Sequence, residues 1–275
     1  MKKYLCLFFI FTIAANATFS EPLVPQEYYD MIAAYFDEGR FHEARALAER
    51  AVNLNPKDKT LHSALGNIFF RLGYADLALE SLNRAFELDN LFAEAYNMRA
   101  GVYILLNDFN RALDDMNMAI FIEPENDRFY RFRGELFIRM GQYENALADL
   151  NKAISLNNKV SVYFSNRATV LFRLGRHEEV MADLNTAIRL DSNNYIAHSD
   201  RGYINFLHKN APHEAILDFT EAIRSNPNHR RAYFNRAFIF RHLAALSGDP
   251  VQAEYYRIRA QLDEDIVARL DGQGE

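Results

Sequence analysis

Apolar and polar residues follow one another along most of this chain in amphipathic helical patterns, and these patterns come in pairs. Alanines mark the period, with a constant step of 34 residues from Ala44 through Ala78 and Ala112 to Ala146. The step reaches Val180 unchanged, then lengthens by one residue to Ala215 and by four to Ala253. Such a period indicates a repeat protein over residues 25–270. The register predicts helical pairs that begin at Pro25, Lys59, Ala93, Asp127, Ser161, Tyr195 and Arg230.

Each pair is divided by a short break that favours a helix end. Glycine stands there four times, at Gly39, Gly73, Gly141 and Gly175, and Asn107 replaces it once. Glycine adopts the positive φ that closes a helix, so we expect a chain reversal at each of these positions. Proline recurs at the other joint, between pairs, where a residue that cannot continue a helix is useful. These prolines are Pro56, Pro124 and Pro227.

Three further positions are shared by the repeats. The fourth is aromatic or histidine in Tyr28, His62, Tyr96, Tyr130, Phe164, His198 and Tyr233. The eighth is small in Gly66, Ala100, Gly134, Ala168, Gly202 and Ala237. A later position is alanine in Ala51, Ala85, Ala119, Ala153, Ala187, Ala222 and Ala260. Small residues let paired helices approach closely.

In these positions the chain resembles the tetratricopeptide repeat family over nearly its whole length after residue 24. The resemblance implies an all-α, right-handed solenoid of about seven helix-turn-helix repeats. Departures from the pattern occur at Ile32, at Val180 and in the segment 246–250. The first and last repeats of such stacks are expected to be irregular because they cap the array.

The first residues differ from all that follow. Lys2 and Lys3 precede an apolar run over residues 5–15, and 15–17 form a small-x-small cleavage site, Ala15-Asn16-Ala17. This predicts a signal peptide over 1–17, removed from an exported protein that is periplasmic or secreted. The alternative, a membrane anchor, is disfavoured because a bilayer span needs about 20 apolar residues. We therefore expect no membrane span after cleavage, a short N-terminal segment over 18–24 and a tail over 271–275.

Composition and charge exclude several classes of protein. The 275 residues are 49% hydrophobic and 25% charged, which is ordinary for a globular chain and excludes disorder. Lys and Arg number 31 against 37 Asp and Glu, a net charge of −6, which disfavours a nucleic-acid partner. The single cysteine, Cys6, can form neither an internal disulfide nor a zinc cage.

Signatures of catalysis are absent from the sequence. It contains no Gly-x-Ser-x-Gly, no Gly-x-Gly-x-x-Gly, no phosphate-binding Gly-Lys-Ser loop and no His-Glu-x-x-His. His208 and His213 lie five residues apart across a joint, without the i, i+4 spacing of two ligands on one helix. We expect no catalytic residues, no metal and no cofactor.

A second pattern pairs arginines with aspartates. Arginine occupies the seventh position in five repeats, at Arg99, Arg133, Arg167, Arg201 and Arg236. Aspartate recurs in the second helix at Asp115, Asp149, Asp183 and Asp218. The arginines could form an anion track, but the matching aspartates favour buried ion pairs with a structural role. The spacing leaves open whether each aspartate pairs within its own repeat or with the next.

The resemblance also implies where a partner binds, because first helices of this family line a concave surface through positions two, five, nine and twelve. The candidate groove residues are Tyr29, Asn67, Asn97, Arg128, Arg131, Glu135, Thr169 and Tyr203. Arg128 and Arg131 form a cationic spot that could select a carboxylate. Some family members clamp the C-terminal carboxylates of chaperones. That clamp is absent here, because Asn166 lacks the flanking lysines and arginine of the motif.

These observations favour a non-enzymatic scaffold or adaptor for protein–protein interaction. It would bind a protein or peptide in the groove, in the bacterial cell envelope. The alternative is a secreted factor that acts on a host or neighbouring cell. Neither the identity of the partner nor the oligomeric state follows from the sequence.

Overall fold

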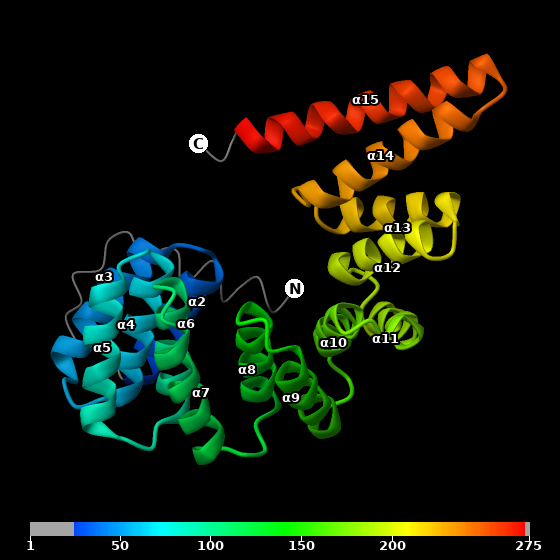
Figure 1. Cartoon of the computed structure of the whole chain (residues 1–275). Helices are drawn as coiled ribbons and strands as arrows, with labels where there is room; N and C mark the ends of the chain where they lie inside the picture. The colour runs from blue at the N-terminus through cyan, green and yellow to red at the C-terminus, as the bar shows by residue number, and fades with distance from the viewer. Residues whose placement is uncertain (1–24, 273–275) are drawn as a thin grey trace, which may run out of the picture. The chain divides into compact units, whose positions relative to one another are not determined.

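The structure, a computed structural model, describes residues 25–272. The predicted signal peptide and the segment 18–24 lie outside this range, as do the last three residues of the predicted tail. Within it the chain forms fourteen α-helices and no strand (Figure 1). The helices fall into two compact units that meet in sequence at Ile122 and Glu123.

The N-terminal unit contains three helical pairs. Its helices are α2 (Pro25–Asp37), α3 (Phe41–Leu54), α4 (Lys59–Arg71), α5 (Ala75–Leu88), α6 (Ala93–Leu105) and α7 (Phe109–Ile122). The second helix of each pair packs on the first, and the first helices α4 and α6 also contact each other.

The C-terminal unit contains four pairs. Its helices are α8 (Asp127–Arg139), α9 (Tyr143–Leu156), α10 (Ser161–Arg173), α11 (His177–Leu190), α12 (Tyr195–Leu207), α13 (Pro212–Ser225), α14 (Arg230–Leu246) and α15 (Pro250–Gly272). The first helices α8, α10, α12 and α14 contact one another in series. They form the face on which the groove is expected.

The first helix of every pair begins at the residue that the 34-residue register gives. At the C-terminus the boundary differs from the sequence expectation, because α15 continues to Gly272 and includes the first two residues of the predicted tail. Asp271 accepts two hydrogen bonds from the Arg230 guanidinium on α14, one of them 2.9 Å long, and this contact lies at the end of the helix.

The joints explain both the period and its one-residue slip. Gly39, Gly73, Gly141 and Gly175 have φ between 73° and 80°, and Asn107 has φ 59°. Three residues separate α4 from α5, whereas four separate α12 from α13. Asn210 lies in this longer joint with φ 49°. The additional residue is therefore absorbed outside the helices, and their packing register is retained.

Small residues hold the paired helices together. All seven alanines of the later shared position are fully buried, with 0% exposure. At Gly66 a Cβ atom would lie 2.7 Å from Cγ of Leu82, closer than packed carbon atoms approach. At these positions the paired helices therefore pack so closely that no space remains for a larger side chain.

Candidate functional site

Arginines and aspartates of the repeats form bidentate ion pairs. We call this series of pairs the arginine ladder. Arg133 donates from Nε and Nη2 to the two oxygens of Asp149, at 2.7 and 2.8 Å. Arg99 with Asp115 and Arg167 with Asp183 have the same geometry. Each aspartate therefore pairs with the arginine of its own repeat, and its side chain is at most 8% exposed in these three pairs.

The third nitrogen of the guanidinium reaches the preceding repeat. Arg99 Nη1 donates to Asn83 at 2.9 Å, and Arg167 Nη1 donates to Asn151 at 2.8 Å. Arg201 Nη1 donates to Asn185 at 2.9 Å. These arginines thus fix two neighbouring layers at once. They are occupied by structural contacts and are not exposed as an anion track.

Two members of the ladder depart from this pattern. Asp218 accepts from Arg201 and also from Asn205 at 2.9 Å, with His198 Nδ1 at 3.5 Å. Burial raises the pKa of the Asp218 carboxyl, but hydrogen bonds from His198 and Arg201 outweigh burial and hold that pKa below its usual value. Arg236 pairs with Asp263 on α15, which the sequence pattern did not identify.

The candidate groove residues of the N-terminal unit lie on three first helices. The Tyr29 hydroxyl donates to Asp58, and burial together with this carboxylate raises the pKa of Tyr29. Asn97 donates to Glu94 at 3.3 Å, and Asn67 is half-buried on α4. These side chains lie on the expected face without forming a pocket of their own among the described cavities.

On α8, the candidate residues Arg131 and Glu135 are engaged with each other. Arg131 Nη1 donates to Glu135 at 2.5 Å, and its guanidinium lies 3.9 Å from the centre of the Phe132 ring. Glu135 also accepts from Asn166 on α10 at 2.7 Å. Arg128 is exposed at the start of the same helix. The cationic spot is therefore partly neutralised by its own helix.

The structure gathers the other two candidates, Thr169 and Tyr203, in a cavity of about 380 Å³ on α10 and α12. Phe172 contributes an apolar wall, and its ring meets that of Tyr203 edge-to-face at 6.0 Å. The charged side chains of this cavity are Arg173, Asp200 and Arg231. We call it the α10–α14 groove, because Arg231 belongs to α14.

Asp200 is the polar centre of the groove. Its side chain is 19% exposed and accepts from the Thr169 hydroxyl at 3.4 Å, while Arg231 approaches it to 3.3 Å. Burial raises the pKa of the Asp200 carboxyl, although Arg231 and Thr169 act against burial. Arg231 is itself 56% exposed and lies 5.6 Å from the centre of the Tyr203 ring. The Arg231 guanidinium is thus largely exposed, whereas the Asp200 carboxylate is mostly buried in the lining of the cavity.

Exposed aromatic side chains are present on the same helices. Phe234 and Phe238 on α14 are 54% and 57% exposed, and Phe238 meets Phe206 on α12 edge-to-face at 5.9 Å. These residues and Arg231 occupy positions two, five and nine of the seventh repeat. The positional rule applied to the first six repeats identifies them when it is extended by one repeat.

Comparison with known families agrees with this geometry. Two family models, both described as tetratricopeptide repeat, match residues 29–91 and residues 128–160 and 163–194. These segments cover helical pairs in both units. These matches identify tetratricopeptide repeats in both units of the chain. A comparison with curated proteins found no match.

Solved structures show the same fold at low sequence identity. A tetratricopeptide repeat protein from Parabacteroides merdae is 22% identical and has a TM-score of 0.65, and the match covers 90% of this chain and 93% of that one. The pilF protein of Pseudomonas aeruginosa is 17% identical with a TM-score of 0.66, over 78% and 97% of the two chains. YrrB, described as having an unusual peptide-binding site, is 22% identical with a TM-score of 0.51, over 67% and 95%.

Tetratricopeptide repeat proteins are generally protein–protein interaction scaffolds and are typically non-enzymatic. Among residues 25–272, no three His, Cys, Asp or Glu side chains gather into a possible metal site. None of the described helices has the length and apolarity that crossing a membrane requires.

Proposed function

We propose that this tetratricopeptide repeat protein is a non-enzymatic adaptor that binds an extended segment of a partner protein in the α10–α14 groove. The observation that carries the proposal is the Asp200–Arg231 pair in the lining of a partly apolar cavity. A peptide backbone offers N–H donors and carbonyl acceptors, which suit the carboxylate and the guanidinium respectively. The peptide binding in the description of YrrB supports the same use of the fold.

Aromatic side chains supply the apolar part of the proposed contact. Phe172 and Tyr203 line the cavity, and Phe234 and Phe238 are exposed on α14. An apolar partner side chain that enters beside Tyr203 would contact aromatic rings, while the Asp200–Arg231 pair orients the backbone. This division of roles is typical of sites that bind a short peptide.

The proposed location is the bacterial cell envelope. It rests on the lysine pair, the apolar run and the small-residue cleavage site of residues 1–17. Fractionation of the producing cells, with N-terminal sequencing of the mature chain, tests it. A chain that begins at Thr18 in the envelope fraction supports the proposal, and a chain that retains Met1 in the cytoplasm contradicts it. Recovery from the culture medium favours the secreted factor instead.

Substitution on the groove tests the binding proposal. In a pull-down from the envelope fraction, we compare the native chain with a Tyr203→Ala, Phe238→Ser variant. The matched control is Phe121→Ser, which removes a 77% exposed aromatic side chain from α7. Circular dichroism verifies that all three are folded. A partner retained by the native chain and the control but lost by the groove variant supports the proposal. Equal retention by all three overturns it.

A further inference from the structure

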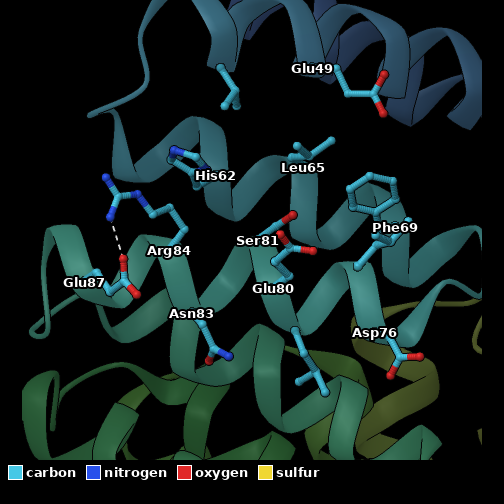
Figure 2. A pocket seen from close by; sticks show the side chains of 13 residues that line it. Glu49, His62, Leu65, Phe69, Asp76, Glu80, Ser81, Asn83, Arg84 and Glu87 are labelled. Carbon is cyan, nitrogen blue, oxygen red and sulfur yellow. Dashed lines mark hydrogen bonds and ion pairs between the residues drawn. The ribbon is translucent and has the colours of Figure 1, made fainter.

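The N-terminal unit carries a hollow of about 780 Å³ on its second helices, separate from the expected peptide groove. Figure 2 shows it between α3, which contributes Glu49, and α5, which contributes Asp76 and Glu80, with α4 between them. Leu65 and Phe69 of α4 form part of its floor and are nearly buried. An apolar floor is thus surrounded by carboxylates.

The hollow lies where the arginine ladder is interrupted. The ladder pair of the third repeat is Arg99 with Asp115, and the residues 34 positions earlier are Leu65 and Ser81. Both line the hollow. In the second repeat, the position of the ladder arginine is therefore occupied by a shorter, apolar side chain, that of Leu65.

The positions that surround Arg99 in the third repeat also surround the hollow in the second, with different side chains. Arg99 Nη1 donates to Asn83, and Glu49 stands 34 residues before Asn83. The Arg99 guanidinium lies 4.1 Å from the centre of the Phe86 ring and 5.6 and 5.8 Å from two tyrosine rings. The residues that correspond to Asn83 and these three rings all line the hollow; they are Glu49, Val52, His62 and Phe69.

The charge of the hollow favours a cation. Its lining contains the carboxylates of Glu49, Asp76, Glu80 and Glu87 and a single guanidinium, that of Arg84, which is paired with Glu87 at 2.5 Å. Arg45 on α3 approaches Glu49 to 3.5 Å along the same helix. Negative charge remains in excess, so a positively charged side chain would be attracted to the site.

We infer that the hollow binds an arginine side chain presented by a partner protein. Arginine suits it better than lysine because a planar guanidinium can donate to Glu49 and to a second acceptor at the same time. Leu77, 43% exposed at the same site, offers an apolar contact to a residue beside that arginine. This inference is independent of the proposed peptide groove in the C-terminal unit.

The first experiment compares two peptides of twelve residues, each with a central residue flanked by leucines. One carries arginine and the other carries citrulline, which has the same shape without the charge. Titration is followed by NMR of the methyl groups of Val52, Leu65 and Leu77. We expect the arginine peptide to bind about tenfold more tightly and to shift these methyl signals. Equal affinity of the two peptides overturns the inference.

Restoring the ladder inside the chain gives the second experiment. In a Leu65→Arg, Ser81→Asp variant the protein supplies its own guanidinium, and the preference for arginine over citrulline should disappear. Glu49→Gln should reduce the same preference and remains informative if the double variant does not fold. Asp114→Asn, which removes a negative charge at the position that corresponds to Glu80 in the next repeat, is the matched control. A folded double variant that keeps the preference contradicts the inference, as does an unaltered preference in Glu49→Gln.

Discussion

The two units share one 34-residue template and differ in how they use its polar positions. Residues 25–122 carry 15 acidic and 9 basic side chains, whereas residues 123–272 carry 20 of each. The C-terminal unit has a ladder arginine in each of its four repeats, and the N-terminal unit has one in three. Where the ladder is complete, its arginines are engaged in ion pairs within the unit. Where it is interrupted, carboxylates remain around an open hollow. The comparison teaches that a ladder position without its arginine leaves an open, negatively charged hollow.

The largest expected effect is the loss of a ladder aspartate. Asp149→Ala removes the carboxylate that accepts two hydrogen bonds from the Arg133 guanidinium. It should lower the free energy of unfolding by about 3–5 kcal/mol. Ser81→Ala, at the corresponding position of the interrupted repeat, should cost less than about 1 kcal/mol. Urea denaturation followed by circular dichroism measures both. Similar losses of unfolding free energy in Asp149→Ala and Ser81→Ala would contradict the view that the ladder stabilises one repeat and is interrupted in the other.

Apolar packing should be equally strict in both units. Gly66→Ala brings a Cβ to 2.7 Å from Leu82, and Gly202→Ala brings one to 3.1 Å from the Ala215 carbonyl oxygen. Each should lower the free energy of unfolding by about 1–3 kcal/mol. At Gly101 the nearest neighbour is 3.9 Å away, so Gly101→Ala should stabilise by about 0.5–1 kcal/mol. Thermal melting of the three variants is the measurement, and a loss at Gly101 would contradict this packing argument.

The smallest effect is a difference in acid response between two ladder carboxyls. Burial raises the pKa of Asp115 above its usual value despite Arg99, whereas the donors around Asp218 lower its pKa. Acidification towards pH 4 should therefore increase the stabilising contribution of Asp115, because its folded form binds the proton more tightly. The contribution of Asp218 should be lost only as the pH falls below its usual pKa. Carbon NMR titration of the two carboxyls checks this, and a shared midpoint would contradict it.

Much of the fold could be predicted because it repeats. The alanine step and the joint glycines mark the helices, and each first helix begins where the register places it. The partner of each ladder arginine could not be predicted in this way. Asp115 lies 16 residues after Arg99 and 18 before Arg133, and either separation joins residues on consecutive helices. Only the packed helices select the first.

The candidate sites were predicted unevenly, for physical reasons. Thr169 and Tyr203 do line a cavity, but Arg131 is engaged by Glu135, a contact that depends on side-chain conformation. Asp263 was missed because α14 and α15 are longer than the other helices, so that the Arg236 pair spans 27 residues. The hollow was missed because it arises where Leu65 replaces a ladder arginine. A search for motifs finds the residues that match a pattern and passes over a position that departs from it.

The four-residue joint between α12 and α13 also matters for engineering. The chain already accommodates an additional residue there, with Lys209 and Asn210 exposed and the flanking helices in register. A protease recognition sequence inserted between these two residues would lengthen a solvent-facing reversal without moving a packed helix. Cleavage would then divide the C-terminal unit at a chosen moment, and the persistence or loss of its helical signal would measure how far α13–α15 depend on covalent connection to the helices before them.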